Sequence, residues 1–416
     1  MSEQEWEVGS LLDPAVLECP FPLFSRLREE APVRFMPDLK MFYVTRYKDI
    51  RTVKRNPQIF SNDIYALGGS RTGPQAAAEA YRREHGWGRV STLQRTDPPV
   101  HTLYRQLVDK AFTPRRVRTM VPYIEGVVND LIDGFIERGE CDFVRDFAVP
   151  LPCTVIADQL GVPRSDVIKI KIWSDAMLGP GGHHMDEAQA LECARLVVEA
   201  QHYFAKVIED RRRQPQDDII SDLVHADVEG RRLDMYELQD LLDQLITGGN
   251  ETTTNAIGSG MMLLLKHPEQ MQYLLEHPEG IKNFVEEVLR VETPVLHLFR
   301  IVLEDTELGG VALPKGSMVA LGYAAANRDE AVFPDGETFD VCRHKAGAHL
   351  SFGSGPHFCP GASLGRQELL SGFSILLKRL DDIRPADPNE TYAHVPHSFL
   401  RGLKALNIRF EKAAGG

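Results

Sequence analysis

The sequence has few of the features that place a protein in a membrane or outside the cell. None of its apolar runs approaches 18 residues, so we expect no membrane-spanning helix. Residues 1–7 are acidic and lack the basic and apolar regions of a signal peptide. Only six cysteines occur in 416 residues, and they lie far apart at positions 19, 141, 153, 193, 342 and 359. This pattern predicts a reducing, cytoplasmic location.

Basic residues are outnumbered, which argues against nucleic acid as a main partner. The chain carries 47 Lys and Arg residues against 60 Asp and Glu residues, a net charge of −13. Hydrophobic residues make up 43% and charged residues 26% of the chain, which is typical of a globular protein. The sequence contains no internal repeat, low-complexity tract or Gly/Ser linker. We therefore expect residues 1–416 to form a single domain.

The most informative stretch surrounds Cys359. Three glycines and two prolines shape this loop: Gly353, Gly355, Gly361, Pro356 and Pro360. A periodic apolar stripe follows, so we expect a helix with Pro360 at its first position. The helix N-terminus next to Cys359 would lower the pKa of the thiol and favour the thiolate. Such a thiolate is commonly a nucleophile, here with His357 as base, a haem ligand or a zinc ligand. Zinc is disfavoured, because no second Cys or paired His lies at metal-finger spacing. A buried structural cysteine is the alternative.

The whole string resembles the haem-binding loop of the cytochrome P-450 family. It reads Phe352-Gly353-x-Gly355-x-His357-x-Cys359-x-Gly361. The resemblance implies that Cys359 is the thiolate ligand of the iron of haem b, iron protoporphyrin IX. It also implies that Phe352, Gly353, Gly361 and His357 contact this cofactor.

A second motif runs from Asp97 to Pro114. The prolines after Asp97 start a helix that carries His101 and Arg105 on one face, four residues apart. Two cationic donors on one face suit a pair of carboxylates, and a solvated basic face is the alternative. The motif resembles the family's propionate-binding helix. The resemblance implies that His101 and Arg105 bind the haem propionates, together with Arg300 and His357.

A predicted buried helix over residues 235–266 has a poor helix-forming centre. Its middle contains Gly248-Gly249 and three successive threonines from Thr252, which disfavour a regular helix. The pattern predicts either a distortion at a functional site or a helix end capped by Asn250 or Thr252. The string resembles the family's oxygen-binding groove. The resemblance implies that Glu251 and Thr252 are the acid–alcohol pair that delivers protons to oxygen.

Two further motifs resemble structural parts of the family. Glu287 and Arg290 stand at i and i+3 of a predicted helix, and Arg343 follows in Phe339-Asp340-x-x-Arg343. The resemblance implies a buried network in which Glu287 lies between the two guanidinium groups, with a role in folding around haem.

The position of several residues in these motifs makes them candidates for the pocket wall. They are Leu245, Gly248, Gly249, Thr252, Val295, Leu298 and Phe399. Most are apolar, which predicts an apolar substrate such as a terpenoid, steroid, alkane or aromatic compound. His297 is a possible polar contact or a solvated turn residue. The pair His183 and His184 lacks the spacing of a metal site and is expected in a loop beside the pocket.

The resemblance spans nearly the whole chain and implies a mostly α fold with small β-sheets, an α+β protein. We expect the β-rich part at residues 30–60 and 295–345, and helices over most of the remainder. Residues 61–96 lack periodicity and predict a long loop over the pocket. Helices are expected over residues 121–242, with one of the breaks at Gly179–Gly182.

The resemblance implies a haem-thiolate monooxygenase. Such an enzyme inserts one oxygen atom of O2 into an organic substrate and takes electrons from NAD(P)H through a ferredoxin reductase and a ferredoxin. The alternative is a peroxide-using peroxygenase, or a redox or gas sensor. Glu251 and Thr252 favour the first, because only reduction of O2 requires proton delivery.

Overall fold

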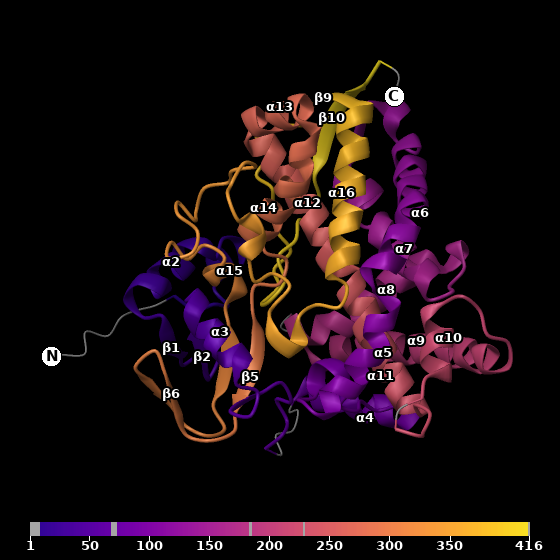
Figure 1. Ribbon diagram of the computed structural model, residues 1–416, viewed down its shortest axis with the longest axis vertical. Helices are drawn as coiled ribbons and strands as arrows, with labels where there is room; N and C mark the ends of the chain where they lie inside the picture. The colour runs from indigo at the N-terminus through magenta and orange to yellow at the C-terminus, as the bar shows by residue number, and fades with distance from the viewer. Residues whose placement is uncertain (1–8, 68–72, 183–184, 228, 415–416) are drawn as a thin grey trace.

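The computed structural model describes residues 9–67, 73–182, 185–227 and 229–414. In Figure 1 the strands of the N-terminal segment lie on the left beside strands from residues 298–321, and most helices lie on the right. The α-helices are α1 Pro14–Glu18, α2 Phe21–Glu30, α3 Tyr47–Arg55, α4 Pro74–His85, α5 Val100–Ala111, α6 Pro114–Asp133, α7 Pro150–Gln159, α8 Val167–Gly182, α9 Glu187–Arg213, α10 Ile219–His225, α11 Met235–Gly249, α12 Glu251–Lys266, α13 Pro268–Glu276, α14 Ile281–Val291, α15 Tyr323–Ala326 and α16 Ala362–Arg379.

The strands are short and form small sheets. They are β1 Val33–Met36, β2 Met41–Val44, β3 Phe60–Ser61, β4 Glu140–Asp142, β5 Leu298–Val302, β6 Thr306–Leu308, β7 Val311–Leu313, β8 Met318–Leu321, β9 Leu380–Pro385 and β10 Asn407–Lys412. Short 3-10 turns connect the elements at η1 Leu93–Arg95, η2 Ile136–Arg138, η4 Arg164–Asp166, η5 Pro278–Gly280, η6 Ala346–Ala348 and η7 Gly355–His357, and η3 Val144–Ala148 is a π-helix. The predicted α+β class with small sheets is confirmed.

The largest sheet joins the two ends of the expected β-rich part. Its strand order is β1-β2-β8-β5-β3, with β2 and β8 parallel and the other pairs antiparallel. Apolar side chains of these strands pack with α3 in one core cluster and with α2 in another. The sheet therefore places β5, with Leu298 and Arg300, at a fixed distance from α3.

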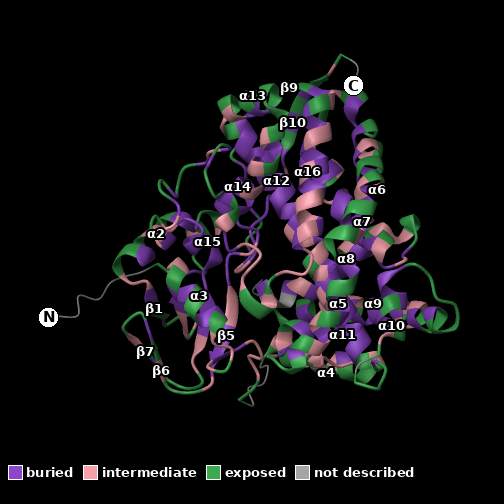
Figure 2. Cartoon of the chain, viewed as in Figure 1, coloured by how far each residue is buried: buried purple, intermediate pink, exposed green. Residues whose placement is uncertain are grey.

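A larger core cluster holds the helical part together. It includes residues of α6, α7, α11, α12, α14 and α16, and α12 is buried over Thr253–Leu265, as Figure 2 shows. Antiparallel strands β4, β10 and β9 form a second sheet, which the sequence did not predict. Because α11 and α12 both contribute to the larger cluster, the break between them lies within the core.

Two loop predictions are wrong. Within residues 61–96, Pro74–His85 forms α4, and its Ala78 packs against Ala190 and Ala194 of α9. The glycines on either side concealed an alanine-rich run that begins with proline, and both features favour a helix. The predicted break at Gly179–Gly182 is the second wrong prediction, since α8 continues to Gly182. His183 and His184 lie outside the described residues.

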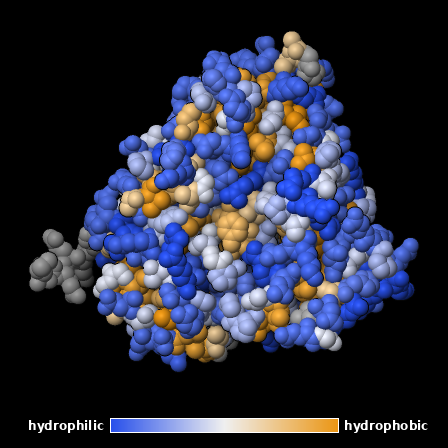
Figure 3. Space-filling model, viewed as in Figure 1, coloured by the Kyte–Doolittle hydropathy of each residue, from blue (hydrophilic) through white to orange (hydrophobic). Residues whose placement is uncertain are grey.

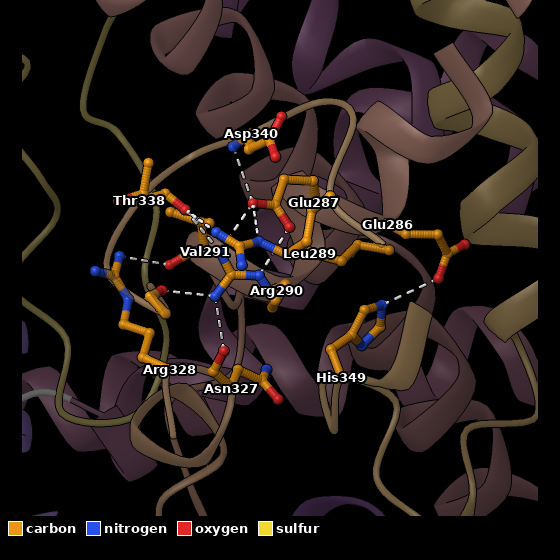
Figure 4. A network of polar contacts seen from close by, with 12 residues as sticks. Glu286, Glu287, Leu289, Arg290, Val291, Asn327, Arg328, Thr338, Asp340 and His349 are labelled. Carbon is orange, nitrogen blue, oxygen red and sulfur yellow. Dashed lines mark hydrogen bonds and ion pairs between the residues drawn. The ribbon is translucent and has the colours of Figure 1, made fainter. Parts of the chain in front are cut away.

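Glu287 on α14 lies at the centre of a buried ionic network (Figure 4). Arg290 Nε and Nη2 donate to its two carboxylate oxygens at 2.7 and 2.8 Å, and Arg343 Nε donates at 2.9 Å. The Glu287 and Arg290 side chains are fully buried. The remaining guanidinium N–H groups donate to backbone carbonyls, among them those of Asn327 and Thr338. The structure therefore brings together the three residues of the predicted network and satisfies their charges.

Asn327 connects this network to the cysteine loop. Its backbone carbonyl accepts from Arg290, and its side-chain oxygen accepts from the Leu350 N–H at 2.6 Å. Its side-chain nitrogen donates to Ser351 Oγ at 2.8 Å. The beginning of the loop is thus bonded to a rigid, buried ion cluster.

The outer surface differs from this interior. Figure 3 shows hydrophilic atoms over most of the face in Figure 1, with a smaller apolar area near its centre. Among the described residues, no helix has the length and apolar character needed to cross a membrane.

Substitution of Glu287 by Gln should destabilise the fold strongly. The change leaves two buried guanidinium groups without a countercharge, which typically costs about 3–5 kcal/mol. Urea unfolding followed by circular dichroism should show this loss, whereas the exposed Glu330→Gln control should change the free energy of unfolding by less than about 0.5 kcal/mol. Equal stability of the two variants would contradict a structural role for the network.

Candidate active site

A cavity of about 560 Å³ lies between the loop before α16 and the break between α11 and α12. The site residues predicted from the sequence that line it are His101, Arg105, Leu245, Gly248, Gly249, Thr252, Val295, Leu298, Arg300, Phe352, Gly353, His357, Cys359, Gly361 and Phe399. These residues come from five separate parts of the chain. The fold therefore brings together nearly all of the predicted site, with Glu251 as an exception.

The cysteine loop is a tight turn. The Cys359 N–H donates to the Phe352 carbonyl at 2.9 Å, and Gly353 and Gly355 adopt left-handed φ values of 67° and 69°. A side chain at Gly355 would also bring a Cβ atom within 3.1 Å of the Lys54 carbonyl. Glycine is required at both positions because a larger residue would be strained there. The turn presents Cys359 to the cavity.

The predicted state of the thiol is wrong in this structure. Burial raises the pKa of Cys359, although backbone N–H groups of Gly361 and Ala362 donate to the sulfur and lower it. Desolvation of the charged form outweighs two hydrogen bonds here. Helix α16 begins at Ala362 with Gly361 as its N-cap, so Pro360 precedes the helix instead of occupying its first position.

Basic side chains surround one end of the cavity. His101 on α5 is buried, and the centre of its ring lies 3.9 Å from that of His357. Arg300 on β5 is also buried, and its Nη1 donates to the Phe299 carbonyl at 2.6 Å. Arg105 pairs with Asp109 at 2.7 Å and donates to the Phe358 carbonyl. Four predicted cationic or potentially cationic groups therefore converge at this end.

The electrostatics of this end favour an anion. Burial, followed by His101 and Arg300, lowers the pKa of His357 to about 2, and its Nε2 has no hydrogen-bond partner among the described residues. Burial, followed by Arg105, lowers the pKa of His101. Burial and the neighbouring cations together disfavour protonation of both imidazoles, and the nearby guanidinium groups of Arg105 and Arg300 would stabilise a bound carboxylate.

Helices α11 and α12 meet at Asn250, which keeps right-handed helical dihedral angles and accepts a 2.9 Å hydrogen bond from Cys153 Sγ. The structure thus favours a distortion within a continuing helical path over a capped start. Thr252 Oγ1 donates to the Gly248 carbonyl at 2.8 Å. A Cβ at Gly249 would lie 3.3 Å from Ile156, so glycine allows α7 to approach closely. The distortion leaves Thr252 on the cavity wall.

Glu251 points toward α8. Its carboxylate lies 3.2 Å from Lys171 Nζ, and the residue is not part of the cavity wall. Lys171 also pairs with Asp175, so the three residues form an ionic cluster beside the helix break. To exchange a proton with the cavity, Glu251 would have to leave Lys171.

Glu368 is a cavity residue that the sequence reasoning missed. It lies on α16, is 2% exposed and hydrogen-bonds with Thr253. Burial raises its pKa from the ordinary 4.5 to about 8. The signal in the sequence was an acidic residue within the apolar stripe that predicts α16. Glu368 is thus a protonated carboxyl group at neutral pH, beside Thr253.

The rest of the cavity wall is apolar with several polar and charged side chains. Apolar members include Leu245, Val295, Leu298 and Phe399. The predicted wall residues were all found there, but the sequence missed polar ones: Asn62, Gln75, Arg89, Gln94, Arg95, Asp243, Gln244 and Thr247.

His297 is absent from this wall, because it is buried against Tyr43 and Phe299. The described residues contain no cluster of His, Cys, Asp and Glu suited to a metal ion.

Comparisons with known proteins agree with this geometry. The family profile described as "Cytochrome P450" matches residues 183–392. The monooxygenase PikC of Streptomyces venezuelae is 36% identical over 401 residues, covering 94% of this chain and 91% of the relative. A steroid C26-monooxygenase of Rhodococcus jostii is 34% identical over 409 residues, covering 95% of this chain and 83% of the relative.

Solved structures are similar over the same length. Cytochrome P450 CYP109Q5 from Chondromyces apiculatus has a TM-score of 0.85 and 34% identity, covering 97% of this chain and 98% of that one. CYP109E1 from Bacillus megaterium in complex with testosterone has a TM-score of 0.83 and 31% identity, with coverage of 95% and 98%.

Glu368 should make the stability of the protein pH-dependent. Between pH 4.5 and 8 the folded protein binds one more proton than the unfolded chain, so its stability falls as pH rises through this window. Glu368→Gln removes this dependence. The free energy of unfolding of the variant, relative to that of the wild type, should therefore rise by up to about 1.4 kcal/mol for each unit increase in pH. Urea unfolding at pH 5, 6.5 and 8 measures the slope. The exposed Glu307→Gln control should follow the wild type, and a Glu368→Gln difference that stays constant with pH would refute the assignment.

Proposed function

Because this chain belongs to the cytochrome P450 family and is a P450 monooxygenase, we propose that it inserts one atom of O2 into a C–H bond of an apolar organic substrate. The observation that supports this most strongly is the convergence of Cys359, the basic cluster and Thr252 on one cavity. The family uses haem as its cofactor. The haem supplies the chemistry of O2 reduction and oxygen insertion, and the chain supplies the environment for it.

The residues around the cavity fit haem b. Cys359 would provide the sulfur ligand of the iron, and the positive φ angles of Gly353 and Gly355 allow the loop to turn beside it. His101, Arg105, Arg300 and His357 would hold the two propionates, because they form a basic site in which His357 Nε2 is buried without a hydrogen-bond partner. Phe352 and Gly361 would contact the ring system from the same loop.

Proton delivery is assigned to Thr252 with either of two carboxyl groups. Thr252 Oγ1 donates its proton to the Gly248 carbonyl, so its lone pairs are available to accept a hydrogen bond from a donor in the cavity. Glu251 can supply protons only if it separates from Lys171. Glu368 already lines the cavity and carries a proton at neutral pH, so it is the second candidate.

The proposed substrate is apolar with a polar substituent. The wall around Leu245, Val295, Leu298 and Phe399 favours a steroid, terpenoid, alkane or aromatic body. The steroid named for one relative and the testosterone bound to a structural neighbour support this class. Polar side chains farther along the wall, such as Arg89 and Gln244, would bind a hydroxyl or carboxyl group.

Electrons would come from NAD(P)H through a ferredoxin reductase and an acidic iron–sulfur ferredoxin. Three exposed basic residues would steer such a partner: Lys110 in the last turn of α5, and Arg115 and Arg118 near the start of α6. Arg116 contributes less, because Asp222 pairs with it at 3.0 Å. We place the protein in the cytoplasm because all six cysteines are free.

Turnover with ¹⁸O₂ and a reconstituted ferredoxin system tests the proposal. The wild type should incorporate one labelled atom into a steroid or terpenoid product. Thr252→Ala should still oxidise NAD(P)H but release the reduced oxygen mainly as hydrogen peroxide. Thr252→Ser keeps the hydroxyl group and should retain most of the product yield. Product that forms only with added peroxide, without label from O₂, would indicate a peroxygenase instead.

A further inference from the structure

Lys54 is a buried lysine at the basic end of the cavity that no motif pointed to. It lies in the last turn of α3 and is 5% exposed, whereas its neighbours Lys48 and Arg55 on the same helix are exposed. Its Nζ lies 3.5 Å from the position of a Cβ on Gly353 and 5.9 Å from the centre of the Tyr323 ring. The ammonium group therefore lies beside the cysteine loop and lines the cavity.

Lys54 has no countercharge in the structure. Among the described residues, no carboxylate forms an ion pair with it, and the one charged group that acts on its pKa is Arg300. Burial, followed by Arg300, lowers this pKa well below its ordinary value. Burial therefore favours the neutral amine, and an anion placed beside Lys54 would restore its charged form; none of the described residues supplies that anion.

The other basic groups at this end of the cavity supply less positive charge than two propionates require. His357 is neutral, and Arg105 is engaged by Asp109 and by the carbonyl of Phe358. Arg300 is buried and has no carboxylate partner among the described residues. Two propionates carry two negative charges, and Arg300 with Lys54 would supply two cations, neither of which forms an ion pair with a carboxylate among the described residues.

We propose that Lys54 is a cationic contact for the haem propionates and shares their binding with Arg300. This inference rests on the proposed haem site, and it adds a residue to the basic cluster identified above. The carboxylate of a propionate would give Lys54 a charge-assisted hydrogen bond, because its Nζ lies beside Gly353 on the cavity wall.

Haem retention by the intact holoprotein tests this role directly. Lys54→Met keeps the length of the side chain and removes its charge, and Lys54→Gln gives a second neutral variant. The rate of haem transfer to an excess of apomyoglobin should rise at least about tenfold in both, as expected for loss of a hydrogen bond between charged groups. Lys54→Arg and the exposed Lys48→Met control should remain within about threefold of the wild type.

Haem dimethyl ester, whose propionates carry no charge, separates the effect of the Lys54 charge from the effect of side-chain packing. With this cofactor, Lys54→Met and the wild type should lose the group at equal rates, because the charge of Lys54 has no partner. An equal acceleration for both cofactors would assign Lys54 to packing and overturn the proposal, as would unchanged retention of haem. Failure of the wild type to bind haem at all would instead overturn the proposed function.

Discussion

The cysteine loop is held by a single buried carboxylate. Glu287 binds two guanidinium groups, and one of these, Arg290, also binds the carbonyl of Asn327. The Asn327 side chain then fixes the start of the loop through the Leu350 N–H and Ser351 Oγ. Cys359 follows within the same tight turn. Because each partner is buried and its charge or hydrogen bonds are satisfied, the loop has little freedom to move, and the rest of the site is positioned against it.

The site itself is unbalanced in charge. Burial raises the pKa of Cys359 and lowers those of His101 and His357. Each of these groups is therefore held in its neutral form by desolvation or by nearby cations, and Arg300 lies close without a carboxylate among the described residues. A ligand that brings a metal ion to the sulfur and two carboxylates to the basic groups would satisfy both ends at once. Haem has this combination of groups.

Sequence patterns predicted those parts of the structure whose conformation is determined by residues a few positions away in the chain. The glycine turn around Cys359, helix α5 with His101, and the distortion at Gly249 each have a signal within a few residues. Partners distant in sequence were harder to predict, because nothing near Glu251 indicates Lys171 of α8 and nothing near Lys54 indicates the cysteine loop. Helix α4 and the position of Pro360 were mispredicted, because flanking glycines and prolines are compatible with more than one local structure.

Besides Cys359, the cavity wall offers His101 and His357 as alternative iron ligands. The absorption spectrum of the reduced carbon monoxide complex distinguishes them most directly. We expect the red-shifted Soret band of thiolate ligation in the wild type and its loss in Cys359→His. A wild-type spectrum typical of histidine ligation, or a red-shifted band that persists in Cys359→His, would contradict the assignment.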